Sequence, residues 1–203
     1  FAWTESYRTL MPLPLAERLT RLTDPALRSA ILDEHRRLPR DDMTAQAQTN
    51  FSRMFRMTMP VDYEPQASDS IGAEADRLGI DQAAHAYDVL MEDGCYRLLY
   101  FPVINYADES LDVVHAMMAS DRALFGLSDG GAHCGTICDA SFPTTTIDLW
   151  RRGNRNGLSF PIEQLVHGYT QRNARHVGWT DRGVIAPGYL ADINLIDLDA
   201  LAL

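Results

Sequence analysis

Lysine is absent from the sequence, and all 18 of its basic residues are arginine. The absence excludes lysine-based chemistry within these residues, such as a Schiff base or a phosphate-binding P-loop lysine. Positive charge is also in the minority, because 28 acidic residues give a formal net charge of −10 at pH 7. A chain this acidic repels phosphate backbones, so we expect no nucleic-acid partner.

Cysteine is scarce and long apolar runs are lacking. The three cysteines, Cys95, Cys134 and Cys138, are too few and too odd in number for a disulfide framework, which favours a reducing compartment. The longest apolar run, Leu98 to Ile104, is far shorter than the ~20 residues that cross a bilayer. No signal-peptide pattern opens the chain. We therefore expect a cytoplasmic protein that does not enter a membrane.

What is present fits an ordinary globular chain, with 46% hydrophobic and 23% charged residues. The first part has helical spacing, with Leu15, Leu19 and Leu22 at i, i+4 and i+7. Residues 40–68 contain several methionines and prolines with little periodicity, which is typical of a long functional loop or lid. Residues 1–96 are therefore expected to be helical and irregular, with a lid.

Several helix boundaries can be predicted from capping residues. Asp24, followed by Pro25, and Asp81 are suited to begin helices, whereas Gly79 and Gly94 are suited to end them. A later helix is expected to follow Ser159 and to end before Gly178. Its predicted buried stripe consists of four apolar residues at helical spacing: Ile162, Leu165, Val166 and Tyr169.

The second part of the chain predicts an α/β arrangement. The runs 98–104 and 123–127 are apolar throughout, as in strands of a parallel sheet that are buried on both faces, and each is followed by a helical pattern. Residues 183–197 change to a strand-and-turn pattern. A (β/α)8 barrel takes about 250 residues, so two such units would be only its last part.

The run from Ser128 to His133 is the strongest candidate for chemistry. Asp129 follows a predicted buried strand, where α/β barrels place reactive groups. Gly130 and Gly131 would let a substrate or metal approach the backbone closely. The alternative is an Asp-Gly turn or helix cap. His133 is either a polar group at the mouth of a site or a histidine satisfied by a local backbone hydrogen bond.

The other chemistry-bearing residues fit known motifs poorly. His133-Cys134 with Cys138-Asp139 lacks the second ligand pair of a structural zinc site, and neighbours such as His133 and Cys134 rarely act as base and nucleophile. The arginine-rich run 151–155 is interpreted as a solvated helix end, with a clamp for an anionic substrate as the alternative. The remaining histidines have no metal-motif spacing and are interpreted as surface or packing residues: His35, His85, His115, His167 and His176.

Three stretches resemble one known superfamily. The run from Leu124 to His133 resembles the eighth-strand segment of the amidohydrolase superfamily, in particular its D-aminoacylase, or N-acyl-D-amino-acid deacylase, branch. Residues 181–197 are similar to that family's return from barrel to β-sandwich, and residues 62–65 and 71–93 to the stretch before its seventh strand. Each stretch alone is moderately specific, but the three in order form a specific pattern.

The resemblance implies an α/β fold, namely the C-terminal part of a metal-dependent (β/α)8 TIM barrel. Residues 1–96 would be a helical, lid-like insertion before the seventh barrel strand. Residues 97–180 would supply the last two barrel βα units, and residues 181–203 would begin a small β-sandwich. The remaining metal ligands are then expected upstream of Phe1, and these 203 residues are expected to be inactive alone.

The resemblance also implies a zinc-dependent hydrolase of non-peptide carbon–nitrogen bonds that acts on a small-molecule amide. In such enzymes one or two zinc ions activate a water for attack on an amide carbonyl. The eighth-strand aspartate, here Asp129, takes the water's proton, passes it to the leaving nitrogen and in many members touches the metal. Gly130, Gly131 and His133 are then expected to border the substrate.

One departure from the family pattern leaves alternatives open. Where D-aminoacylases that bind a substrate carboxylate often have His-Pro-Arg, this chain has His133-Cys134-Gly135. A cyclic-amide (hydantoinase-like) or deaminating amidohydrolase with the same metal chemistry is therefore an alternative. A non-catalytic piece that needs a complementing chain is another. The sequence does not fix the oligomeric state.

Overall fold

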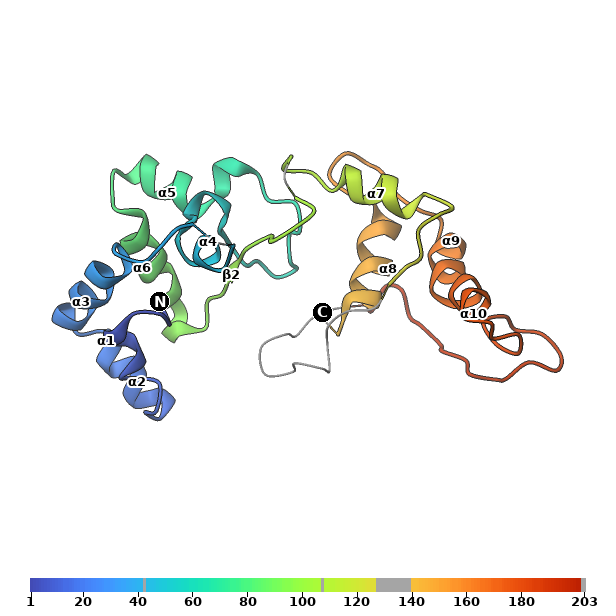
Figure 1. Ribbon diagram of the computed structural model, residues 1–203, viewed down its shortest axis with the longest axis horizontal. Coiled ribbons are helices and arrows are strands. Elements are labelled where there is room, and N and C mark those ends of the chain that lie inside the picture. Colours follow the sequence, from blue (N-terminus) through green and yellow to red (C-terminus); the bar gives the residue numbers. More distant parts are fainter. Residues whose placement is uncertain (42, 107, 127–139, 202–203) are drawn as a thin grey trace. The chain divides into compact units, whose positions relative to one another are not determined.

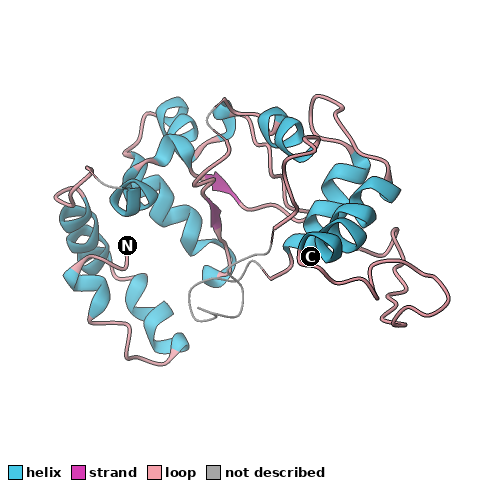
Figure 2. Cartoon of the chain, turned by 45° about the vertical axis from the view of Figure 1, so that its right-hand side comes forward, coloured by secondary structure: helices cyan, strands magenta, loops and turns pink. Residues whose placement is uncertain are grey.

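The computed structural model describes residues 1–41, 43–106, 108–126 and 140–201 (Figure 1). The chain divides into two compact units, Phe1–Glu109 and Ser110–Leu203, and each has an apolar core of its own. In the described residues, helices account for nearly all of the regular structure, and the strands are short (Figure 2).

The first unit is a set of short helices with one two-stranded ribbon. In chain order its elements are α1 (Glu5–Arg8), α2 (Leu15–Leu22), α3 (Pro25–His35), α4 (Met43–Thr49), the 3-10 turn η1 (Phe51–Arg53), β1 (Phe55–Arg56), the 3-10 turn η2 (Ala67–Asp69), α5 (Ile71–Leu78), α6 (Gln82–Cys95) and β2 (Leu99–Tyr100). Helices α2, α3, α5 and α6 lie where helical spacing and capping residues predict helices. The prediction of a long loop over residues 40–68 is wrong in part, because α4, η1 and β1 lie within this range. A helix as short as the seven-residue α4 leaves little periodicity in the sequence to predict it.

The helix boundaries follow local capping chemistry. The Asp24 carboxylate accepts a hydrogen bond from the Ala26 amide at 2.8 Å, and Pro25 occupies the first turn of α3. Asp81 caps α6 in the same way. Helix α5 ends at Gly79, whose φ of 65° lies in the left-handed region that favours glycine. These boundaries confirm the prediction from the capping residues.

The core of the first unit is built from the facing sides of α2, α3, α5 and α6. Its buried members are Leu10, Leu22, Ile31, Leu32, Phe51, Met54, Ile71, Ala83, Ala86, Tyr87 and Val89. Ile31 and Ile71 are fully buried, and burial of a side chain of this size contributes roughly 1.5–3 kcal/mol. Tyr87 donates its hydroxyl to the Leu22 carbonyl oxygen at 2.7 Å, so its polar atom is satisfied inside the core.

The run 98–104 forms a strand, but not the strand that was predicted. Only Leu99–Tyr100 is extended, and it pairs antiparallel with β1 in the register Phe55 to Tyr100. Leu98 and Ile104 are 62% and 71% exposed. The prediction of a parallel strand buried on both faces is therefore wrong for this run, because the described residues give it only one neighbouring strand.

The second unit consists of helices that surround an aromatic core. Its elements are α7 (Asp112–Met118), α8 (Phe142–Arg152), α9 (Ile162–His167), the π-helical turn η3 (Gly168–Arg172) and α10 (Asn173–His176). The buried core members are Phe125, Trp150, Phe160 and Leu165. Elements α9, η3 and α10 follow one another without a gap, and the chain leaves them at Gly178 with a φ of 79°, as expected for a helix end.

Two further strand predictions are not observed in the described residues. Residues 123–126 have no strand pairing, although Phe125 is buried in the core. Residues 183–197 form turns and irregular backbone, and apolar side chains such as Ile185 and Leu195 are 85% and 101% exposed. An apolar extended segment becomes a strand only when a partner strand satisfies its backbone groups, and no such partner lies in the described part of the chain.

Candidate functional site

The predicted catalytic run lies outside the residues that the structure describes. Asp129, Gly130, Gly131 and His133 all fall in residues 127–139. The same range holds the residues of the alternative metal or nucleophile site: Cys134, Cys138 and Asp139. The roles of Asp129 as proton carrier and metal contact, and of its neighbours as substrate contacts, therefore stay predictions.

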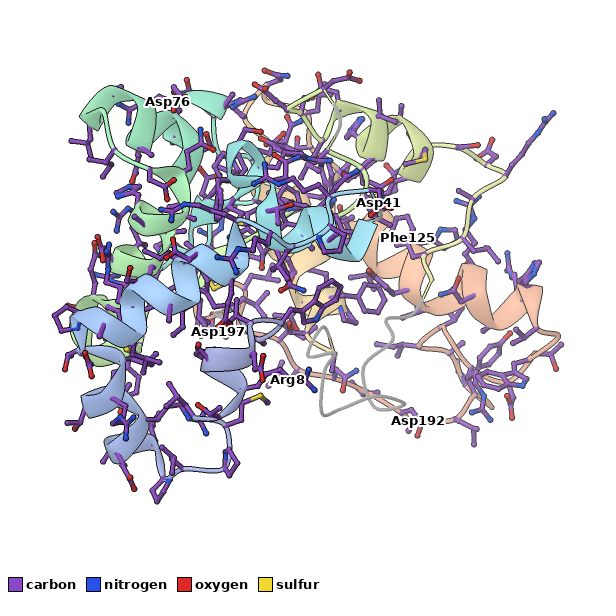
Figure 3. The ribbon with its side chains drawn as sticks, turned by 60° about the vertical axis from the view of Figure 1, so that its left-hand side comes forward. Arg8, Asp41, Asp76, Phe125, Asp192 and Asp197 are labelled. Atoms are coloured by element: carbon purple, nitrogen blue, oxygen red, sulfur yellow. The ribbon has the colours of Figure 1, made fainter. Side chains whose placement is uncertain are left out.

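The described structure does show how the chain enters this run. Phe125 is 9% exposed and packs in the core of the second unit (Figure 3). The Asn173 side-chain amide donates a hydrogen bond to the Phe125 carbonyl oxygen at 2.9 Å. Gly168 lies so close to the Phe125 ring that a Cβ atom there would be 2.6 Å from a ring carbon. Both the backbone and the ring of Phe125 are thus held by the helical stretch that contains η3.

The chain leaves the run directly into helix α8. Pro143 occupies the first turn of this helix, and Phe142 begins it. The Phe142 ring centroid lies 5.7 Å from that of Tyr169. The ring centroid of Phe125, which precedes the run, lies 5.1 Å from the same Tyr169 centroid. Burial raises the pKa of Tyr169, although a hydrogen bond with the Thr146 hydroxyl opposes the shift.

The arginines considered as a substrate clamp are engaged by a neighbouring carboxylate. Asp148 lies one turn before them on α8, and its Oδ1 is 2.5 Å from Arg152 Nη2 and 3.8 Å from Arg151 Nη2. Arg151 also donates to the Leu198 carbonyl oxygen at 2.9 Å. Both guanidinium groups are thus engaged by partners within the second unit, although the single Asp148 carboxylate balances only one of the two positive charges. This geometry favours the helix-end interpretation.

A charged cluster in the first unit joins α5, α6 and β1. His85 Nε2 lies 2.7 Å from Glu74 Oε2, and Arg56 Nε lies 3.2 Å from the same oxygen. Arg56 also reaches Glu92 at 2.7 Å. Burial acts to raise the pKa of Glu74, but the hydrogen bond from His85 and the charge of Arg56 outweigh it, so the pKa is lowered. Because His85 is only 8% exposed, the pair is placed to hold three elements together.

The contact between Glu74 and His85 has no direct signal in the residue spacing. The two residues lie on successive helices separated by the left-handed turn at Gly79. Their distance depends on the angle between these helices, which residue spacing alone does not specify. A glycine-terminated helix followed directly by an Asp-capped one is the only sequence feature that points to a tight pair of helices here.

The other described histidines agree with the packing or surface role predicted for them. His35 is 2% exposed in α3 and lies 2.8 Å from the Gln48 carbonyl oxygen, and burial lowers its pKa. The His115 ring stacks on Phe160 with centroids 4.2 Å apart. Two further histidines are exposed on α9 and α10: His167 and His176.

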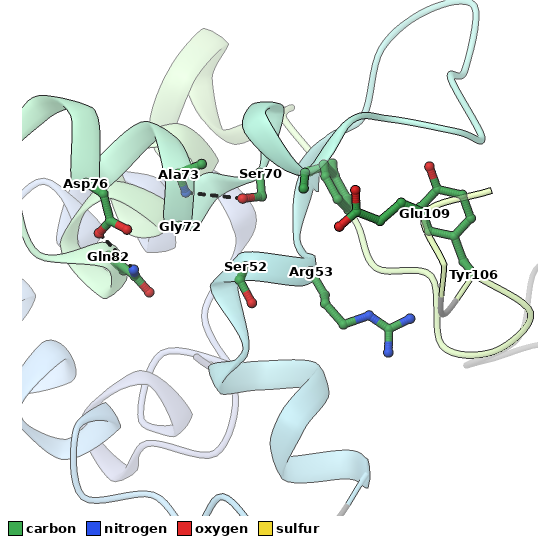
Figure 4. Close-up of a pocket in the computed structure, with 11 residues that line it drawn as sticks. Ser52, Arg53, Ser70, Gly72, Ala73, Asp76, Gln82, Tyr106 and Glu109 are labelled. Atoms are coloured by element: carbon green, nitrogen blue, oxygen red, sulfur yellow. Dashed lines mark hydrogen bonds between the residues drawn. The ribbon is translucent and has the colours of Figure 1, made fainter. Parts of the chain in front are cut away.

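The first unit has a surface cavity of about 330 Å³ (Figure 4). Its lining residues include Ser52, Ser70, Asp76, Gln82, Tyr106 and Glu109. Ser70 caps α5 and Asp76 accepts a hydrogen bond from Gln82, so these polar atoms already take part in holding the fold. Arg53, which Figure 4 shows between Ser52 and Tyr106, donates to the Pro102 carbonyl oxygen at 2.8 Å. The cavity therefore offers mixed charge rather than a set of groups aimed at one ligand.

The described residues do not by themselves form a metal site. No group of three or more His, Cys, Asp or Glu side chains converges among them. A family-type metal centre would therefore depend on Asp129, a carboxylate of the kind that binds zinc, together with ligands from elsewhere. Within the described part of the chain, no helix is both long and apolar enough to cross a membrane.

Comparison with known proteins identifies one family. The model of the amidohydrolase family matches residues 43–203, a stretch that includes Asp129 and the helices of the second unit. No curated protein and no solved structure gave a significant match. The family match confirms the superfamily that the sequence resembles, and it supports an α/β barrel-type fold and a metal-dependent hydrolase in general. On this evidence the chain belongs to the amidohydrolase family.

Proposed function

We propose that the chain supplies the eighth-strand segment of an enzyme that hydrolyses carbon–nitrogen bonds in small amides, in the manner of N-acyl-D-amino-acid deacylases. The observation that carries the proposal is the Ser128–His133 run, which lies inside the family match of residues 43–203. In this proposal residues 1–96 form a helical lid, residues 97–180 the last two barrel units and residues 181–203 the beginning of a β-sandwich.

Asp129 is the residue proposed to move the proton. A carboxylate at the end of a barrel strand can accept a proton from water and return it to the leaving nitrogen. Zinc, when bound, would lower the pKa of that water and polarise the amide carbonyl. On the resemblance, Asp129 contributes to the metal site, and the other ligands lie on earlier barrel strands outside residues 1–203.

A second candidate substrate class is the cyclic amides. The residues after Asp129 read His133-Cys134-Gly135, without the arginine that would bind a substrate carboxylate. Arg151 and Arg152 are engaged by Asp148 and do not offer a replacement. A ring amide or another amide without a carboxylate needs no such arginine, so these two observations favour the second class.

A substrate panel tests the proposal and separates the two classes. The purified enzyme, in the full length that its gene encodes, is assayed with N-acyl-D-amino acids, their L-enantiomers and hydantoin-type cyclic amides. We expect amide hydrolysis that a chelator abolishes and added zinc restores, and the preferred group of substrates identifies the class. Absence of hydrolysis of any amide, or full activity after metal removal verified by elemental analysis, would contradict the proposal.

A further inference from the structure

Tyr169 contacts one residue before and one residue after residues 127–139 in the chain. Its ring meets Phe125 edge-on at 5.1 Å and Phe142 edge-on at 5.7 Å. Phe125 is near the end of the stretch described before residue 127, and Phe142 is near the start of the stretch described after residue 139. A single side chain therefore contacts the chain on both sides of residues 127–139.

The helical stretch that contains Tyr169 also holds the backbone at Phe125. Asn173 lies one turn after Tyr169 and donates its side-chain amide to the Phe125 carbonyl oxygen at 2.9 Å. Gly168 immediately precedes Tyr169, and its lack of a side chain leaves room for the Phe125 ring. Phe125 is thus held through its ring and its carbonyl group, and its position depends on this stretch.

Tyr169 lies at a local change of helix geometry. Residues 168–172 form the π-helical turn η3 between α9 and α10. A π-helical turn rotates the following side chains relative to a regular helix and is frequent at functional sites. Within the predicted stripe, Leu165 is fully buried and Val166 is 42% exposed, whereas Tyr169 reaches the two phenylalanines.

We propose that Tyr169 is a positioning residue of this amidohydrolase: its ring clamps Phe125 to Phe142 and so fixes the span across which the segment with Asp129 is attached. This inference rests on the proposed function of Asp129. The ring provides the contacts, so the aromatic group is required and the hydroxyl, which bonds Thr146, is dispensable.

Substitutions at Tyr169 test the clamp in the full-length enzyme. Tyr169→Ala removes both ring contacts, and a misplacement of about 1 Å in a reacting group can cost on the order of 100-fold in rate. We expect Tyr169→Ala to lower kcat by roughly 10- to 100-fold with KM and metal content little changed. Tyr169→Phe keeps the ring and should retain kcat within a few-fold.

The matched control is Phe160→Ala, since Phe160 is buried in the same core and its ring contacts are with His115 and Trp150. If Tyr169→Ala does not fold, Gly168→Ala provides a second test, because its added methyl group displaces the Phe125 ring and should also lower kcat. Hydrogen exchange of the amides at residues 123–126 and 140–142 gives a readout that is independent of activity. We expect faster exchange at both ends in Tyr169→Ala.

Two results would overturn the clamp. One is unchanged exchange at both ends together with unchanged kcat in Tyr169→Ala. The other is an equal loss of kcat in Phe160→Ala and Tyr169→Ala, which would mean that only core stability matters. The variant Asp129→Asn separates this failure from failure of the proposed function: if it turns over normally, Asp129 has no role, whatever the exchange data show for Tyr169.

Discussion

The two units of the molecule are stabilised in different ways. In the described residues, the first unit has a core drawn from several capped helices, and its charged cluster satisfies a partly buried carboxylate internally. The second unit has a smaller aromatic core, and Tyr169 at its edge contacts both Phe125 and Phe142. The comparison indicates that the first unit is held by internal packing, whereas the packing of the second also holds Phe125 and Phe142, which precede and follow residues 127–139 in the chain.

Truncation of one buried side chain in each unit should have the largest effect and tests whether the two cores are independent. Ile31→Ala in α3 and Leu165→Ala in α9 each remove a fully buried side chain and should each cost roughly 2–5 kcal/mol of unfolding free energy. Hydrogen exchange should rise in α3 and α6 for Ile31→Ala and at residues 123–126 for Leu165→Ala. An identical exchange pattern in both variants would contradict the independence of the two cores.

Loss of the Glu74 carboxylate should weaken only the first unit. Glu74→Gln removes the charged partner of His85 and Arg56, and a lost hydrogen bond between partly buried groups costs roughly 1–3 kcal/mol. The folded-state pKa of Glu74 is lowered, so its contribution is present above the ordinary carboxylate pKa and is lost as the pH falls through the folded-state value. Denaturant unfolding should therefore show a flatter acid limb in Glu74→Gln than in the exposed control Glu17→Gln.

His35 should make the first unit sensitive to mild acid. Its Nε2 donates to the Gln48 carbonyl oxygen, and its Nδ1 is buried with no partner among the described residues, so the neutral ring fits and the charged ring does not. The lowered pKa means that stability is full above about pH 6.5 and falls below it, by at most about 1.4 kcal/mol per pH unit. His35→Gln should remove this slope between pH 7 and 5, and the exposed control His167→Gln should keep it.

Removal of a helix cap should give the smallest of these effects. Asp24→Ala and Asp81→Ala each leave an amide at a helix start without its side-chain acceptor and should cost about 1 kcal/mol. Asp24→Asn should be nearly neutral, because asparagine also caps helices. Thermal unfolding measures the difference; a cost for Asp24→Asn equal to that of Asp24→Ala would show that the carboxylate acts in some other way.

The features that sequence predicted well are local ones. Asp24, Asp81 and Gly79 mark helix boundaries because a cap satisfies the amides of its own first turn and a left-handed glycine ends its own helix. Such interactions span only a few residues, so the residue types at these positions are enough to predict the helix boundary. The histidines lack metal-motif spacing, which can also be recognised from nearby residues and predicts a packing or surface role for them.

The features that sequence missed depend on partners far away in the chain. The run 98–104 was expected to be buried in a parallel sheet, but an apolar run does not specify its neighbour, and its partner is the antiparallel strand β1. Helical spacing predicts Tyr169 as a member of a buried stripe, but it does not specify the ring contacts with Phe125 and Phe142, and Val166 of the same stripe is 42% exposed. The role of Asp129 was inferred from resemblance to a family, and no contact in the described residues bears on it.

The central claim is that Asp129 moves the proton in amide hydrolysis, and one variant tests it most directly. Asp129→Asn in the full-length enzyme keeps the size of the side chain and removes its ability to accept a proton. We predict retained metal content and a loss of kcat of about 100- to 10,000-fold, while the exposed control Asp192→Asn keeps normal turnover. Near-normal turnover of Asp129→Asn, with its metal content intact, would contradict the account.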